Sequence, residues 1–186
     1  MTITKTKVHL GCGKRNFGPD WYHIDGTKFD HVDSFDIVHL PFKDDSMDLL
    51  YASHVIAYFD RTEVIDLFKE WNRVLKPGGI LRVATPNFDQ MAYLYIQKDI
   101  TLDKFVGPLY GKMEMDGKTI YHKTVYDEDS LCETFWKSGF VSPRYWYWEE
   151  VDHGIHDDHS QAYIPHMDKK NGALISLNME AVKPQQ

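Results

Sequence analysis

The chain has 186 residues, of which 42% are hydrophobic and 14% aromatic, enough for one domain with a full hydrophobic core over residues 1–186. Its formal net charge of -7 argues against nucleic acid or an anionic membrane surface as the main partner. No apolar run approaches the roughly 20 residues that span a bilayer, and residues 1–7 carry no apolar signal region. We therefore expect a cytoplasmic protein that acts on a small molecule.

Short apolar runs in the first half of the chain are typical of buried parallel strands. They cover residues 8–10, 21–24, 34–38, 49–52 and 80–84, and the run at 34–38 is the weakest.

Three helices are predicted between and after these strands. The clearest covers residues 61–75, because Asp60 and Glu63 form a capping pattern and apolar residues recur at 3–4 spacing. The other two helices cover residues 89–97 and 129–138.

The end of the chain returns to strands, in "SPRYWYW" and in "ALISLNMEAV", where apolar and polar residues alternate. The order predicts an α/β fold with a mostly parallel sheet and an antiparallel last strand. Residues 99–126 interrupt the alternation with a small hairpin that turns at Asp116-Gly117. We expect this segment to be a cap insertion on the carboxyl edge of the sheet.

A glycine turn and two acidic residues stand at the ends of the first three predicted strands. Gly11 and Gly13 lack a Cβ, so the backbone can approach a ligand closely. Ligands of open parallel sheets bind beyond the carboxyl ends of the strands. There the Asp25 carboxylate could accept hydrogen bonds from ribose hydroxyls, and Asp36, beside the apolar Ile37, suits an adenine ring.

The spacing of this motif argues against a dinucleotide. Only seven residues, Lys14 to Asp20, separate the turn from the next apolar run. A pyrophosphate normally rests on the N-terminus of a helix, and the acidic residue then follows about 20 residues later. The sequence therefore predicts a nucleoside ligand with little or no phosphate, and a nicotinamide oxidoreductase is disfavoured.

Four motifs, "VHLGCG", "WYHIDG", "DIVHLPFKDDSMDLLYASHVIAYF" and "RVLKPGGILRVATPNF", give residues 7–96 a close resemblance to small, type-11-like class I S-adenosylmethionine-dependent methyltransferases. The resemblance implies a Rossmann-like seven-stranded sheet with helices on both faces and S-adenosylmethionine as cofactor. It implies cofactor contacts as follows: Gly11, Cys12 and Gly13 to the amino-acid portion, Asp25 to the ribose, Asp36 and Ile37 to the adenine, and Ser53 and His54 to the sulfonium end.

The chain departs from the family's pattern at two places. His9 stands where the family often has an acidic residue two positions before the first glycine. After the fourth strand, residues 54–58 read "HVIAY" where the family often reads "HVLEH". Neither change removes the ribose and adenine acids.

A histidine-rich loop covers residues 150–171 and follows the predicted sixth strand to the same edge. Three interpretations remain open. The loop is a polar lid, or one histidine is a general base toward the acceptor, or His153, His156, Asp157 and His159 form a metal site. The candidates for the base are His159, His156 and His122. Cys12 and Cys132 match no metal or disulfide spacing.

These observations predict an S-adenosylmethionine-dependent methyltransferase for a small-molecule acceptor, and a sugar- or nucleotide-linked molecule is one candidate. The alternatives are a catalytically silent adenosylmethionine-binding protein and a metal-dependent enzyme centred on the histidine-rich loop.

Overall fold

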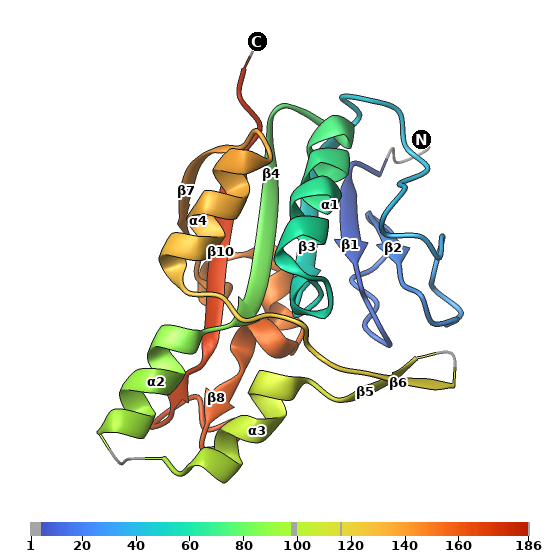
Figure 1. Ribbon diagram of the computed structural model, residues 1–186. Helices are drawn as coiled ribbons and strands as arrows, with labels where there is room; N and C mark the ends of the chain where they lie inside the picture. The colour runs from blue at the N-terminus through green and yellow to red at the C-terminus, as the bar shows by residue number, and fades with distance from the viewer. Residues whose placement is uncertain (1–4, 98–99, 116, 186) are drawn as a thin grey trace.

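A six-stranded sheet with the order β2-β1-β3-β4-β10-β7 forms the centre of the molecule in the computed structural model (Figure 1), which describes residues 5–97, 100–115 and 117–185. Its strands are β1 (Lys7–Leu10), β2 (Trp21–Ile24), β3 (Met47–Ser53), β4 (Leu75–Pro86), β7 (Val141–Tyr145) and β10 (Ser176–Val182). Strands β1 to β4 are parallel, and β10 runs antiparallel to both β4 and β7. This confirms the predicted α/β sheet and its antiparallel last strand.

The sheet has one strand fewer than the resemblance implied. Of the strand expected at residues 34–38, only a single parallel bridge between Ile24 and Ser34 forms. The reason is local: the Asp36 carboxylate accepts hydrogen bonds from the backbone N–H groups of Val38 (2.8 Å) and His39 (3.0 Å). The chain therefore turns here, and the prediction of a strand at 34–38 was wrong.

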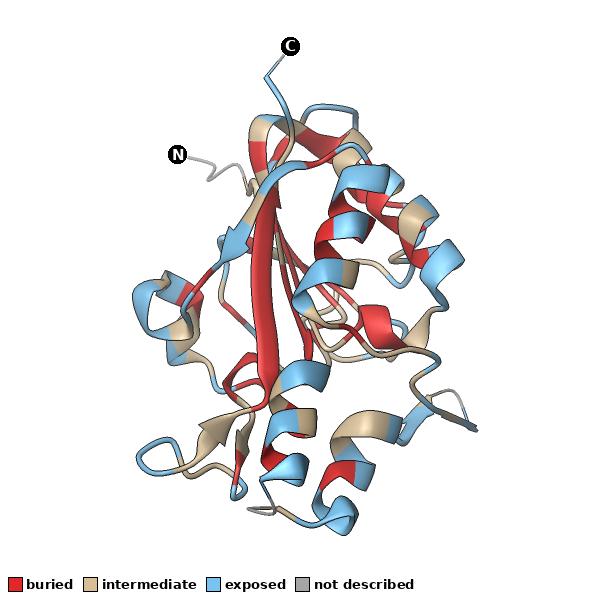
Figure 2. Cartoon of the chain, turned by 60° about the vertical axis from the view of Figure 1, so that its left-hand side comes forward, coloured by how far each residue is buried: buried red, intermediate tan, exposed pale blue. Residues whose placement is uncertain are grey.

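Helices α1 (Arg61–Val74) and α4 (Glu128–Lys137) cover one face of the sheet. The predicted capping box of α1 is confirmed, because Asp60 accepts from the Glu63 N–H and Glu63 accepts from the Asp60 N–H. Figure 2 shows that the helices are buried on one side only, whereas the central strands are buried along most of their length. The main core lies between these two layers and includes Phe68, Trp71 and Phe135.

The other face of the sheet carries no α-helix in the part of the chain that the structure describes, so the expectation of helices on both faces was wrong in this respect. The cover consists of the segment 13–20 and of three 3₁₀ turns: η2 (Trp148–Glu150), η3 (Asp152–Ile155) and η4 (His159–Gln161). Residues 11–20 connect β1 to β2, and the seven that follow the glycine turn are too few for a packed helix. Aromatic rings fill the space instead, among them Phe17, Trp21, Tyr51 and Trp146.

A third group of elements lies beyond the carboxyl edge of the sheet. It consists of the 3₁₀ turn η1 (Ile56–Tyr58), the helices α2 (Phe88–Ile96) and α3 (Leu102–Tyr110), and the strand pairs β5 (Met113–Met115) with β6 (Lys118–Ile120) and β8 (Tyr163–Ile164) with β9 (Ala173–Leu174). Strands β5 and β6 pair antiparallel on either side of the predicted hairpin turn. Asp116 in that turn, and Asp99 at the start of the expected cap, lie outside the described residues.

The longest helix, α1, has 14 residues. None of the helices in ranges 5–97, 100–115 and 117–185 has the length and apolar character that a membrane crossing requires.

Three histidines are buried under the second face and are held in the neutral form. His23 Nε2 accepts the Phe17 N–H at 2.9 Å, and His153 Nε2 lies 3.1 Å from the donating Arg82 guanidinium. Burial and the neighbouring His31 lower the pKa of His23 to about 4, and burial and the Arg82 charge lower the pKa of His153 to about 3. His9 stacks on Phe17 at 3.9 Å, and burial lowers its pKa well below the usual value.

We predict that acid destabilises the protein through these rings. In the unfolded chain histidine titrates near pH 6.5, so stability is fully present above that pH and falls as the pH drops toward 4. Each histidine should remove on the order of 1 kcal/mol per pH unit in this window. Urea unfolding at pH 7.5, 6 and 5 measures the slope. His153→Gln should flatten the slope and the exposed His166→Gln should not; equal slopes in both variants would refute the assignment.

Candidate functional site

The two glycines of the turn after β1, Gly11 and Gly13, differ in how closely other residues pack against them. Gly11 has a φ of +65°, and a Cβ placed on it would lie 2.2 Å from Val55 Cγ2. Gly13 has a φ of +55°, but no atom lies within 4 Å of its would-be Cβ. Gly11 is therefore required by the packing of the turn against the loop after β3, whereas Gly13 leaves open space beside the backbone.

Asp25 joins this turn to the end of β2. Its Oδ2 accepts the Gly13 N–H and its Oδ1 accepts the Thr27 N–H, both at 2.7 Å. Each oxygen keeps a second lone pair, so the carboxylate still has acceptor capacity for hydroxyl donors. The structure thus brings together the glycine turn and the acidic residue expected to hold a ribose.

The side chains of Cys12 and Asp36 do not lie open beside the glycine turn as Asp25 does. The Cys12 side chain is fully buried, and burial together with the Asp25 charge raises the pKa of its thiol to about 12. Only the Cys12 backbone is left to meet a ligand. Asp36 is exposed and pairs with its own loop, with Oδ2 3.1 Å from His39 Nδ1. Ile37 packs against the core, and its carbonyl accepts the Trp71 indole N–H at 2.9 Å.

The end of β3 presents two polar side chains to the carboxyl edge. Ser53 Oγ is buried and has no hydrogen-bond partner among the described residues. His54 adopts a left-handed backbone conformation with φ +53°, and its Nε2 lies 3.2 Å from Ser176 Oγ at the start of β10. A buried hydroxyl without a partner at this edge is what a missing polar ligand would leave behind.

Histidines from three separate segments meet at this edge. The rings of His54 and His159 are 5.2 Å apart. Burial lowers the pKa of His54 well below its usual value, with further contributions from His159 and His122. Burial also lowers the pKa values of His122 and His159. All three rings are therefore neutral at pH 7 and can accept a proton.

The remaining histidines of the loop lie elsewhere. His156 stacks on Phe17 at 4.7 Å, and His153 is buried beneath the second face. Of the three candidate bases, His159 and His122 lie at the edge and His156 does not.

The metal interpretation of the loop finds no support. Within 5–97, 100–115 and 117–185, no group of three or more His, Cys, Asp or Glu side chains is placed to hold a metal ion. The loop is instead pinned to the domain: Tyr51 donates to Asp158 at 2.6 Å, and Arg15 Nε donates to the Asp157 carbonyl at 2.9 Å.

Sequence reasoning missed three residues that complete the site. Tyr58 donates to the Gly111 carbonyl at 2.7 Å and stands edge-on to the His122 ring at 4.6 Å. Arg15 and Ser176 bind neighbours far away in the chain. Of these three, only Tyr58 could have been noticed in the sequence, because it is the last residue of the segment that departs from the "HVLEH" pattern.

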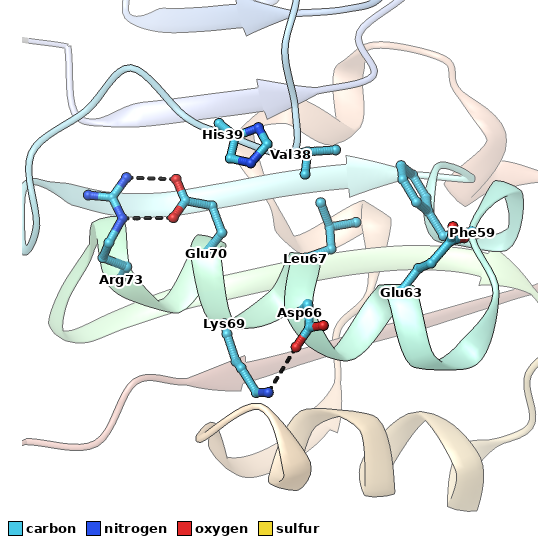
Figure 3. A pocket seen from close by; sticks show the side chains of 9 residues that line it. All are labelled: Val38, His39, Phe59, Glu63, Asp66, Leu67, Lys69, Glu70 and Arg73. Atoms are coloured by element: carbon cyan, nitrogen blue, oxygen red, sulfur yellow. Dashed lines mark hydrogen bonds and ion pairs between the residues drawn. The ribbon is translucent and has the colours of Figure 1, made fainter.

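A cavity of about 580 Å³ lies against the outer side of α1 (Figure 3) and is not part of this site. Val38, the residue after Ile37, lines this cavity, but none of the predicted site residues does. Several of its polar walls are already paired, as in Arg73 with Glu70 at 2.6 Å and Lys69 with Asp66 at 2.9 Å.

Comparisons with known proteins find methyltransferases. The type-11 family model described as a methyltransferase domain matches residues 9–83. The chain is 29% identical over 142 residues to the demethylmenaquinone methyltransferase of Staphylococcus haemolyticus, covering 67% of this chain and 56% of that protein. It is 31% identical over 121 residues to the enzyme of the same name from Staphylococcus aureus, covering 59% and 46%. The chain thus spans about half the length of the curated relatives that it matches.

Solved structures share the fold. A S-adenosylmethionine-dependent methyltransferase from Methanosarcina mazei superposes with a TM-score of 0.60 at 16% identity, covering 100% of this chain and 95% of that one. A 1,6-didemethyltoxoflavin N1-methyltransferase from Burkholderia thailandensis gives 0.55 at 11% identity, covering 96% and 71%. Residues 9–83 thus match the model of a methyltransferase domain, and the whole chain has the fold of S-adenosylmethionine-dependent methyltransferases.

These similarities imply S-adenosylmethionine as the cofactor, and the residues present fit it. The open space at Gly13, the remaining acceptor capacity of Asp25 and the unpartnered Ser53 hydroxyl lie on neighbouring strands of one edge. The individual contacts of these residues, and those of Asp36 and Ile37, remain predictions.

We predict that the two turn glycines differ in what they tolerate. Gly13→Ala should cost about 1 to 2 kcal/mol from its positive φ alone. Gly11→Ala should cost a further 1 to 3 kcal/mol or so, because its methyl group would overlap Val55. Urea unfolding measures both. Adding Val55→Ala should relieve the Gly11 variant and not the Gly13 variant; equal costs without such relief would contradict the packing role of Gly11.

Proposed function

We propose that this protein transfers a methyl group from S-adenosylmethionine to a small-molecule acceptor. The observation that carries the proposal is the meeting of His54, His122 and His159 at the carboxyl edge where the glycine turn and Asp25 lie. The family match supports the donor, and the neutral histidines supply proton acceptors for a hydroxyl or amine.

The bound cofactor supplies a methyl group that is already activated by its sulfonium. The chain then has to align an acceptor behind that group, exclude water, and remove a proton where the acceptor carries one. His159 is our first choice as general base, because its ring lies 5.2 Å from that of His54 at the edge and its pKa lies below the usual value, so the ring is neutral at pH 7. His122 is the second choice.

We further propose that residues 99–126 cap this site. Three contacts support the placement: a Cβ on Gly26 would lie 3.1 Å from Met115 Sδ, Tyr58 donates to the Gly111 carbonyl, and the Lys123 N–H donates to the Ala57 carbonyl at 2.8 Å. The inserted segment therefore extends from η1 to the end of β2, over the edge where the cofactor is expected.

The class of acceptor is supported by two observations. The Staphylococcus relatives are named for a small organic acceptor, demethylmenaquinone. The chain's net charge of -7 disfavours a polyanionic nucleic acid. A location in the cytoplasm stays a prediction.

A catalytically silent adenosylmethionine-binding protein is the alternative that a specific observation favours. The "HVLEH" positions are occupied by residues that pack: Val55 and Ile56 are buried, and Tyr58 binds the inserted segment. This alternative predicts cofactor binding without methyl transfer to any acceptor.

We predict that the protein binds S-adenosylhomocysteine and not NAD in calorimetric titrations. Asp25→Asn should weaken this binding by about tenfold, because one charge-assisted acceptor of the ribose is lost. The matched control is the exposed Asp30→Asn, which makes no side-chain hydrogen bond with the described residues and should bind normally. Unchanged binding by Asp25→Asn would show that the ribose lies elsewhere.

We predict that His159→Gln lowers methyl transfer about a hundredfold, the usual size of a general-base contribution, while leaving S-adenosylhomocysteine affinity unchanged. Product formation from a panel of hydroxylated small molecules measures it, with His166→Gln as the exposed histidine control. The wild-type rate should be level above pH 6.5 and fall at lower pH as His159 becomes protonated. Full activity in His159→Gln would transfer the assignment to His122, whose Gln variant is the next test.

A further inference from the structure

A second cavity, of about 440 Å³, lies at the carboxyl end of the sheet next to β7. Its volume falls in the range of roughly 300–1,000 Å³ that small-molecule sites occupy. Its walls come from the ends of β4, β7 and β10, the first turn of α2, and the β8–β9 pair. They comprise Asn87, Gln90, Tyr145, Trp146, Tyr147, Trp148, Glu149, Tyr163, Ala173, Leu174, Ser176 and Asn178.

Aromatic rings form the apolar part of this cavity and are held in place. Trp148 donates its indole N–H to the Tyr163 hydroxyl at 3.3 Å, and Lys169 Nζ lies 4.9 Å from the centre of its ring. Tyr145 donates to Glu128 at 2.6 Å. Tyr147, by contrast, is 58% exposed, so a large apolar ring faces solvent beside fixed neighbours. Such a surface is pre-formed to receive an apolar face.

Polar groups without partners surround these rings. The Glu149 carboxylate and the Tyr147 hydroxyl are exposed, and like the Gln90 amide they make no side-chain hydrogen bond with the described residues. Asn87 uses its Oδ1 to accept the Gln90 N–H at 3.2 Å, which leaves its Nδ2 as a donor. The cavity therefore offers both donors and acceptors around an aromatic surface.

The cavity adjoins the proposed methyl-transfer site through one residue. Ser176 lines the cavity, and its Oγ lies 3.2 Å from His54 Nε2, next to Ser53 and the His159 ring. Ser176 Oγ also donates to Asn178 Oδ1 at 2.8 Å, which fixes its position. No histidine lines the cavity, so Ser176 is the residue through which the cavity and the histidines adjoin.

We propose that this cavity binds a neutral sugar ring, and that the ring is part of the methyl acceptor. A pyranose has an apolar C–H face that packs on an aromatic ring and several hydroxyls that each need a donor or acceptor, which matches the two kinds of wall. A planar aromatic acceptor would use the rings but would offer few hydroxyls to the amides and the carboxylate. The assignment of the ring to the acceptor rests on the proposed function; the binding of the ring does not.

The test is a titration of the full chain with methyl glycosides of glucose, galactose and mannose, and with 2-naphthol as a planar aromatic probe. Saturation-transfer NMR and tryptophan fluorescence detect binding. Tyr147→Ala should weaken binding of the preferred glycoside by about tenfold through loss of one aromatic face. Gln90→Ala should weaken it as well. The matched control is Tyr95→Ala, another exposed tyrosine, which lies outside the cavity and should bind normally.

Affinity for S-adenosylhomocysteine, measured on the same samples, separates this proposal from the proposed function. Glycoside binding that is lost in the cavity variants while cofactor affinity is unchanged supports the proposal. Absence of glycoside binding, binding that survives both cavity variants, or binding of 2-naphthol alone overturns it, even where the cofactor binds. Glycoside binding without any cofactor binding would retain the sugar site and refute the proposed methyl transfer.

Discussion

The short connection between β1 and β2, residues 11–20, is the constraint on which the rest of the structure depends. It is too short for a helix, so the second face of the sheet needs another cover. Phe17 in this connection packs on His9, and His153 and His156 of the histidine-rich loop stack on Phe17 in turn. The loop is therefore a structural layer of the domain, and the hydrogen bond from Tyr51 to Asp158 holds it there. Because Asp158 is fixed, the next residue, His159, reaches the carboxyl edge beside His54.

Local features of the sequence predicted much of the fold. The capping pattern at Asp60 and Glu63 and the 3–4 spacing placed α1 to within one residue, because these signals act between neighbours in the chain. The glycine turn and Asp25 were also correctly placed at adjacent strand ends, since the order of parallel strands brings those ends to one edge. The sequence could not predict that Gly11 is tightly packed and Gly13 is not, because the packing of Gly11 involves Val55, more than forty residues away.

The wrong expectations share a physical cause. The strand at residues 34–38 had a weak pattern, and the side chain of Asp36 turned the backbone before a ladder could form. Helices on both faces were implied by resemblance, but the length of one connection excluded one of them. The contact between His54 and Ser176 joins positions 122 residues apart, so no local pattern could have revealed it. The sequence predicts well the features that depend on contacts between residues close together in the chain. The contacts of His54 with Ser176 and His159 depend on long-range packing.

A lowered histidine pKa occurs in two different places in this structure. Burial lowers the pKa of His9, His23 and His153 under the second face, where a neutral ring packs among aromatic rings or accepts a hydrogen bond. Burial also lowers the pKa of His54, His122 and His159 at the edge, where a neutral ring can take a proton from an acceptor. A low pKa therefore does not distinguish a structural histidine from a functional one. What differs is the surroundings: the His159 ring lies 5.2 Å from that of His54, at the edge that also carries the glycine turn and Asp25, whereas His153, six residues earlier, is buried under the second face.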